Sequence, residues 1–246
     1  MSLPSRQTPD QLLRGRSELL RTFVEEAPLE RTSILAFVAE RARVLPVGAR
    51  VLDVGAGEAP YRELFAAQEY VTLDHAETEH SGRVNIVASA DAIPVDDGTF
   101  DAVVCTQVLE HVPNPLVTLK ELRRVLADGG HLIATVPFAW EEHERPHDYY
   151  RYTSAGITYL LLSAGFDQIE VKPRTDCFTT LAQLVRNAAW VMGSAPDGLD
   201  RLRGEARGAL EVISDQLSRL APLDVNMLMP LGYSVFASAH AGKTHR

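Results

Sequence analysis

A short apolar run that ends in glycines constrains the fold of this chain more than any other feature. Residues 50–55 read Arg-Val-Leu-Asp-Val-Gly, and Ala56 and Gly57 follow. A short apolar stretch of this kind is typical of a parallel strand that is buried on both faces. Glycines directly after such a strand let the backbone approach a ligand at the carboxyl edge of the sheet. The segment therefore predicts an α/β fold with a ligand site after an early strand.

Strand and helix patterns alternate through the rest of the chain. Strands are predicted at residues 50–55, 70–74, 84–87, 100–105, 131–136, 166–171 and 232–237. Helical spacing is found at residues 9–26, 29–45, 61–67, 115–126, 154–165 and 177–221. This alternation predicts a Rossmann-like, doubly wound, mostly parallel seven-stranded sheet with helices on both faces. N-terminal helices precede the sheet, and a helical insertion precedes its last strand.

The predicted organisation is one α/β domain with additions. Residues 1–48 form the N-terminal helices, which act as a cap, and residues 49–174 form the ligand-binding core. Residues 175–226 form the insertion, residues 227–240 return to the core, and residues 241–246 are a tail. Apolar residues at helical spacing leave three roles open for the insertion, namely a cover for the pocket, added core, or the surface of a homodimer.

Composition excludes several classes of function. The net charge is -9, and no cluster of Lys and Arg with interleaved aromatic residues is present, so a nucleic-acid partner is not expected. No apolar run is long enough to cross a bilayer and the start has no signal core, so we expect a cytoplasmic protein without a membrane partner. Cys105 and Cys177 give neither a disulfide framework nor metal-ligand spacing.

The residues around the glycines distinguish between ligands. A dinucleotide-binding loop needs a third small glycine where this chain has Pro60. Asp53 and Glu58 place carboxylates around the loop, which repel a pyrophosphate and suit a ligand with an ammonium and a sulfonium group. A tight strand-to-helix turn without any ligand is the alternative. The loop therefore favours a cationic ligand.

Acidic residues follow the next two strands. Asp74 closes the second strand, where a carboxylate can accept hydrogen bonds from both ribose hydroxyls. Asp91 can accept a hydrogen bond from an adenine amino group while the backbone amide of Ala92 donates to the ring. The alternatives are a capped or solvated strand end at Asp74 and an Asx-turn at Asp91.

Together these segments carry a resemblance to a known family. The matching segments are Val51 to Gly57, Asp74, Asp91-Ala92 with Pro94, Phe100-Asp101, Leu109-Glu110-His111-Val112 and Leu126 to Pro137. They resemble class I S-adenosylmethionine-dependent methyltransferases of the methyltransferase type 11 kind. The resemblance implies S-adenosyl-L-methionine as cofactor and S-adenosyl-L-homocysteine as product.

The resemblance also implies roles for individual residues. Its first motif contacts the methionine portion of the cofactor and falls on Asp53, Gly55, Ala56 and Gly57. The ribose role falls on Asp74 and the adenine role on Asp91 and Ala92. Thr106 and Gln107 match positions that line the methionine and methyl region.

A polar, aromatic loop at residues 137–153 follows a parallel strand and therefore sits at the ligand edge of the sheet. His143 is the first candidate for a catalytic base or acceptor-orienting group, and His147 is the second. Alternatively Asp148, Arg151 and Tyr152 form a structural network that fixes the loop. A metal set of His143, His147 and Asp148 lacks established ligand spacing, so no metal site is predicted. His111 is assigned to packing around the site.

The predicted function is methyl transfer to an oxygen or nitrogen of a small-molecule acceptor, either sugar-like or a secondary metabolite. Two alternatives stay open. A non-catalytic protein can keep the cofactor fold as a scaffold, because no single residue is indispensable for catalysis. An NAD-dependent oxidoreductase is disfavoured by Pro60 and Glu58.

Overall fold

The computed structural model describes residues 9–75, 84–191 and 200–240, and the predicted tail at 241–246 lies outside this range. Within it, one seven-stranded sheet has the order β3-β2-β1-β4-β5-β7-β6. Its strands are β1 Arg50–Val54, β2 Glu69–Asp74, β3 Ile86–Val87, β4 Phe100–Thr106, β5 Leu126–Pro137, β6 Asp167–Pro173 and β7 Gly232–Ala239. Strands β1 to β5 pair in parallel, whereas β7 runs antiparallel to both β5 and β6. The predicted mostly parallel sheet is confirmed.

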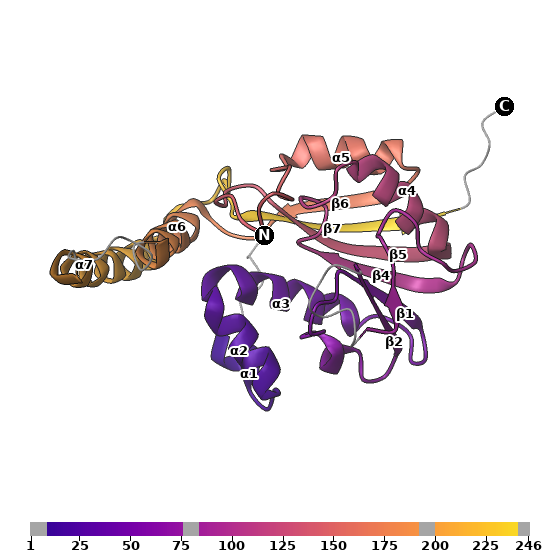
Figure 1. Ribbon diagram of the computed structural model, residues 1–246, viewed down its shortest axis with the longest axis horizontal. Helices are drawn as coiled ribbons and strands as arrows, with labels where there is room; N and C mark the ends of the chain where they lie inside the picture. Colours follow the sequence, from indigo (N-terminus) through magenta and orange to yellow (C-terminus); the bar gives the residue numbers. More distant parts are fainter. Residues whose placement is uncertain (1–8, 76–83, 192–199, 241–246) are drawn as a thin grey trace.

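Helices cover both faces of this sheet (Figure 1). They are α1 Pro9–Leu13, α2 Glu18–Glu26, α3 Pro28–Ala42, α4 Pro115–Val125, α5 Ser154–Ser163, α6 Cys177–Val191 and α7 Asp200–Arg219, with 3-10 turns at Arg62–Phe65 and Ala221–Leu223. Helices α4 and α5 lie on one face and α1 to α3 on the other. Helices α6 and α7 extend sideways from the body as an arm.

Strand β4 shows how the sequence separates the two faces. Side chains alternate along a strand, so Val103 and Cys105 pack with α4 and α5, whereas Ala102 and Val104 pack with α2 and α3. All four side chains are fully buried. The continuous apolar pattern that predicted a parallel strand thus fills two cores at once.

Three predicted boundaries are wrong. The single helix expected at 9–26 is interrupted, because Gly15 takes a left-handed φ of 73° and Ser17 caps α2 by accepting a hydrogen bond from the Leu20 amide. The segment at 61–67 forms only a 3-10 turn. Helix α4 ends at Val125 and β5 begins at Leu126, before the predicted start of this strand at residue 131.

The arm is joined to the body through α6. The Leu29 amide donates to the Gln183 side chain, and the Asn187 amide group donates to the Glu141 carboxylate, both from α6. Helix α7 packs on α6 and on the 3-10 turn at Ala221–Leu223. The base of the arm therefore contacts α3 and the loop after β5, while most of its length projects away from the sheet (Figure 1).

Candidate functional site

The glycine turn after β1 is shaped by a close approach of backbone and side chain. Gly55 and Gly57 have left-handed φ angles of 68° and 53°. A Cβ atom at Gly55 would lie 2.4 Å from Val108 Cγ2, so a larger residue would require Val108 or the turn to shift. The amides of Gly55 and Ala56 both donate to the Leu73 carbonyl on β2. The turn is thereby held open at the carboxyl edge of the sheet, as predicted.

Asp74 at the end of β2 holds this same turn. Its Oδ2 accepts a hydrogen bond of 2.8 Å from the Gly57 amide, and its Oδ1 accepts one of 2.7 Å from the His75 amide. The side chain is largely buried. Each oxygen keeps a further lone pair that can accept a hydrogen bond from a ribose hydroxyl. The expected contact with a ribose stays a prediction.

Asp91 and Ala92 lie in an exposed turn after β3. The Ser89 hydroxyl donates to the Asp91 carboxylate, and the Ala92 amide donates 3.1 Å to the Ser89 carbonyl. This is a backbone turn and not the Asx-turn that was the alternative for Asp91, because the Ile93 amide donates to the Glu121 carboxylate instead. The adenine role of both residues stays a prediction, and any contact from the Ala92 amide must share the hydrogen already donated to Ser89.

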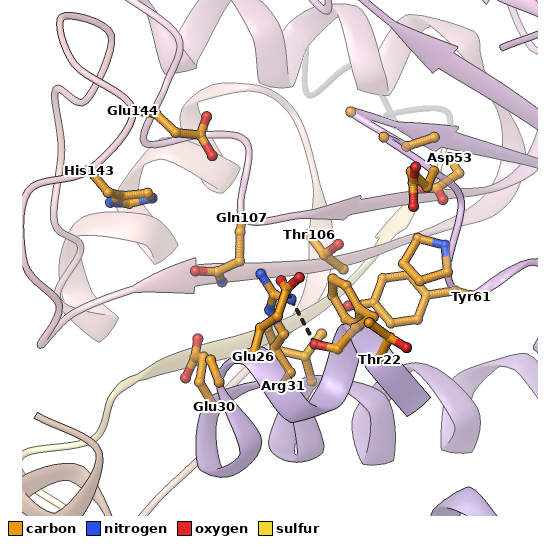
Figure 2. A pocket seen from close by; sticks show the side chains of 18 of the residues that line it. Thr22, Glu26, Glu30, Arg31, Asp53, Tyr61, Thr106, Gln107, His143 and Glu144 are labelled. Atoms are coloured by element: carbon orange, nitrogen blue, oxygen red, sulfur yellow. Dashed lines mark hydrogen bonds and ion pairs between the residues drawn. The ribbon is translucent and has the colours of Figure 1, made fainter. Parts of the chain in front are cut away.

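A cavity of about 610 Å³ opens beside the glycine turn (Figure 2). The predicted site residues that line it are Asp53, Gly55, Ala56, Gly57, Thr106, Gln107 and His143. Predicted residues outside its lining are Asp74, Asp91, Ala92 and His147. The cavity therefore joins the glycine turn, the end of β4 and the loop after β5, three segments that are far apart in the sequence.

The N-terminal helices form the opposite wall, which sequence reasoning described only as a cap. The wall residues from this layer are Leu19, Thr22, Phe23, Glu26, Ala27, Glu30, Arg31 and Ile34. Arg31 forms an ion pair with Glu26, donates 2.7 Å to the Phe23 carbonyl, and lies 4.2 Å from the centre of the Phe23 ring. Helical spacing predicted these helices, but only the tertiary structure brings their polar side chains to the cavity.

Asp53 lies at the floor of the cavity and is 2% exposed. Its carboxylate accepts a hydrogen bond from the Tyr70 hydroxyl. Burial, reinforced by the nearby charge of Asp74, raises the pKa of Asp53 to about 7. A cation bound beside this carboxylate would favour its ionised form, which fits a ligand that carries positive charge.

The loop at residues 137–153 is fixed by a network around one ion pair. Arg151 donates two hydrogen bonds of 2.7 Å to the two oxygens of Asp148, and it also donates to the carbonyls of Trp140 and Glu141. The guanidinium holds the pKa of Asp148 well below its usual range. The Tyr152 hydroxyl donates 2.6 Å to the Leu109 carbonyl. The structural network that was the alternative for this loop is therefore present.

The two candidate histidines of this loop differ in position. His143 lines the cavity, its amide donates to Asp148 Oδ2 at 2.9 Å, and its ring Nδ1 lies 3.2 Å from the same oxygen. His147 is exposed, and its ring Nδ1 lies 3.2 Å from the Tyr149 hydroxyl. The structure thus brings His143, and not His147, to the cavity.

Glu110 and His111 were not predicted as site residues. His111 lines the cavity, and its ring centre lies 4.7 Å from that of His143. Glu110 is fully buried, and burial raises its pKa to about 8. Both residues belong to a segment that carried the family resemblance, but their proximity to His143 depends on the folding of the loop after β5.

A family comparison decides the class of this protein. The model of a family described as "Methyltransferase domain" matches residues 23–163, which is more than half of the chain. The chain belongs to this family. The predicted class I methyltransferase family, with S-adenosylmethionine as its cofactor, is thereby confirmed.

Curated relatives match the methyltransferase over part of its length. A ubiquinone biosynthesis O-methyltransferase of Xanthomonas axonopodis pv. citri is 34% identical over 105 residues, which cover 37% of this chain and 44% of the relative. A tRNA U34 carboxymethyltransferase of Desulforapulum autotrophicum is 31% identical over 99 residues, covering 34% of this chain and 30% of the relative. The chain thus matches less than half the length of these relatives.

Solved structures agree with the fold. The [4+2]-cyclase SpnF has a TM-score of 0.57 at 18% identity, with 98% of this chain and 100% of that chain covered. Phosphoethanolamine N-methyltransferase 2 of Haemonchus contortus, solved with S-adenosyl-L-methionine, has a TM-score of 0.53 at 17% identity, with 85% and 52% covered. At this identity the likeness shows the fold alone. Among the described residues, no helix is both long and apolar enough to span a bilayer.

Proposed function

We propose that this methyltransferase transfers a methyl group from S-adenosylmethionine to an oxygen or nitrogen of a small-molecule acceptor. One observation carries the proposal, namely that a single cavity of about 610 Å³ joins the cofactor turn after β1 to the loop that presents His143. A volume of this size is typical of small-molecule sites. We further propose that this acceptor is sugar-like or a secondary metabolite.

The cofactor end of the cavity suits S-adenosylmethionine. Asp53, Gly55, Ala56 and Gly57 would hold its methionine portion, because a carboxylate and close backbone meet there. When bound, the cofactor supplies a methyl group attached to a positively charged sulfur. The acceptor atom attacks the methyl carbon in line with the carbon–sulfur bond, and the sulfur is a good leaving group. The protein therefore needs mainly to align the acceptor and to exclude water. Thr106 and Gln107, at the end of β4, line the region between the two ends of the cavity.

The acceptor end lies between α2, α3 and the loop after β5. His143 is the proposed base or acceptor-orienting group. Its Nδ1 lies near both the Asp148 carboxylate and the Glu141 carbonyl, 3.2 Å from each. A proton on Nδ1 leaves the Nε2 lone pair available, which is the arrangement that a general base needs.

A nucleic-acid acceptor is not favoured, although one relative is a tRNA-modifying enzyme. The net charge is -9, and the cavity wall carries Asp53, Glu26, Glu30, Glu58 and Glu144. Carboxylates repel a phosphate backbone. A cytoplasmic location and a homodimer formed through the helical arm stay predictions, and a sedimentation mass would test the dimer.

Isothermal titration with S-adenosylhomocysteine tests the cofactor half of the proposal. Asp91→Ala should weaken binding about tenfold or more, because one adenine hydrogen bond to a charged group is lost. Asp74→Ala should weaken it further, because Asp74 also holds the glycine turn. Asp96→Ala is the matched control, since Asp96 is an exposed carboxylate in the same segment.

Turnover separates the enzyme from a scaffold. Release of S-adenosylhomocysteine is measured across a panel of small hydroxyl and amine acceptors. Binding without turnover on any acceptor would favour the non-catalytic alternative. Tight binding of NAD without binding of S-adenosylhomocysteine would instead revive the oxidoreductase.

A further inference from the structure

Three side chains that could bind a metal ion lie together at the acceptor end of the cavity, where His111 and His143 line the wall and Glu110 is buried behind it. The potential ligand atoms of Glu110, His111 and His143 all lie within 4.8 Å of one another. We infer that these three residues bind a divalent transition-metal ion, which holds an oxygen of the acceptor beside the cofactor. The inference rests on the proposed function and narrows its acceptor atom to oxygen. It also narrows the role of His143 to orienting the acceptor through the metal, because a nitrogen that binds the ion cannot act as the base.

The carboxylate of Glu110 lacks the partners that a buried carboxylate needs. The residue is 0% exposed, and neither oxygen has a hydrogen-bond partner on another residue. Nε2 of His111 lies 3.9 Å from Oε1, beyond hydrogen-bond distance. A buried carboxylate is costly unless it is paired or coordinates a metal. A bound cation would supply the missing partner.

Both histidines are oriented as metal ligands usually are. Nδ1 of His111 lies 2.8 Å from the His147 carbonyl, which can only accept, so this nitrogen carries the proton. Nδ1 of His143 likewise faces two acceptors, the Glu141 carbonyl and the Asp148 carboxylate. Each ring therefore turns an Nε2 lone pair away from these acceptors. Such outer partners are what fix the tautomer of metal-binding histidines.

The donor set matches a divalent transition-metal ion. Two imidazoles and one carboxylate suit Zn²⁺, Mn²⁺ or Fe²⁺ and leave coordination positions open. Bonds of ~2.1 Å place the ligand atoms of one ion roughly 3.0–3.4 Å apart, so small side-chain rotations bring these three onto one ion. Glu144 is a further oxygen donor, with Oε2 lying 3.8 Å from His111 Nε2.

The place of the cluster explains what the ion would do. His111, His143 and Glu144 line the same cavity as the cofactor turn, and His143 and Glu144 are seen at one end of it in Figure 2. An oxygen bound at an open position would lie within this cavity, and the ion would lower the pKa of its hydroxyl. Methylation of a hydroxyl of high pKa needs its deprotonation, whereas an amine has only to lose its ammonium proton, whose pKa is far lower, so an oxygen acceptor gains more from the ion.

Metal binding to the full chain, without an affinity tag and after removal of metals with EDTA, tests the inference. Free Mn²⁺ is counted by electron paramagnetic resonance, and Zn²⁺ is titrated by calorimetry. We expect one ion per chain, with Glu110→Gln and His143→Gln each weakening affinity at least about tenfold. His240→Gln is the matched control, because His240 is beyond the end of β7 that pairs with Gly130, at the opposite edge of the sheet.

Cofactor binding distinguishes the possible failures. S-adenosylhomocysteine should bind all variants within about threefold of the wild type, which also shows that they fold. The metal site is overturned if the wild type shows no saturable binding of either ion, or if both variants bind like the control. If the metal binds but S-adenosylhomocysteine does not, the proposed function fails and the metal site stands.

Discussion

Asp53 makes cofactor binding depend on pH. Burial raises the pKa of Asp53 to about 7. Without ligand, its carboxyl group is therefore protonated in a large fraction of the molecules at neutral pH. A bound ammonium group stabilises the carboxylate, so binding releases this proton and strengthens as the pH rises through the pKa. From about pH 6 to pH 8 the affinity for S-adenosylhomocysteine should rise up to about tenfold.

Calorimetry in two buffers with different ionisation enthalpies measures both the affinity and the proton released. Asp53→Asn cannot ionise and keeps the shape of the side chain, so its affinity should be lower at about pH 8 and almost independent of pH. A wild-type affinity that stays constant across this range would contradict the role assigned to Asp53.

A side chain at Gly55 would meet both a steric clash and an unfavourable backbone conformation. An added Cβ would lie 2.4 Å from Val108 Cγ2, and the substituted residue would have to keep the left-handed φ of Gly55. Gly165 also has a left-handed φ, of 90°, but a Cβ there has nothing within 4 Å. Gly165→Ala should therefore cost only about 1–2 kcal/mol of unfolding free energy, whereas Gly55→Ala should cost more.

Urea unfolding of both variants, together with titration of S-adenosylhomocysteine, separates strain from steric clash. Gly55→Ala should also lose about tenfold or more in affinity, because the turn must shift away from Val108. Equal costs in the two variants would mean that the clash is relieved by the Val108 side chain, and that the turn itself is not displaced.

At the scale of single elements, predictability follows how many neighbouring residues carry the signal of each element. Strands β1 and β4 were recognised because their side chains fill two cores. Burial on both faces requires a run of consecutive apolar residues, and such a run is visible in the sequence. The break at Gly15 and the start of β5 at Leu126 were missed. The first depends on one glycine and one cap, and the second on pairing between Phe100 and Leu126.

The candidate site divides in the same way. The glycine turn was predictable, because its glycines and Asp53 are adjacent in the sequence. The position of Arg31 and the approach of His111 to His143 were not, because each requires two distant elements to fold against each other. Sequence spacing reports contacts within an element far better than contacts between elements.

The loop at residues 137–153 depends on the geometry of the Arg151–Asp148 pair as well as on its charge. Arg151→Lys keeps the charge but loses the two-pronged contact and the bonds to the Trp140 and Glu141 carbonyls. We expect turnover to fall at least about tenfold, because His143 is no longer held, while the affinity for S-adenosylhomocysteine changes less than about threefold.

Limited proteolysis provides the second measurement for this variant, since a loosened loop should be cut faster than in the wild type. Arg145→Lys is a suitable control, because Arg145 lies in the same loop but is exposed and pairs only with Glu142 in the described structure. Parallel losses of turnover and of cofactor binding would show that the loop supports the whole cavity and not only its acceptor end.

At the scale of the whole molecule, one buried ion pair joins the N-terminal layer to the far edge of the sheet. Arg174 follows β6 and donates 2.6 Å to Glu30 on α3 and 2.8 Å to the Ser33 hydroxyl. The side chains of the pair are only 1% and 7% exposed. Because Glu30 also lines the cavity, this contact positions the helical wall against the core.

Removing one partner should be more harmful than removing both. Arg174→Met leaves the Glu30 charge buried and unpaired, and it should cost about 3–5 kcal/mol of unfolding free energy. Adding Glu30→Leu replaces the pair with apolar side chains and should recover most of this loss. Urea unfolding of both single variants and the double variant gives the coupling energy. Additive costs would show that the two groups do not interact.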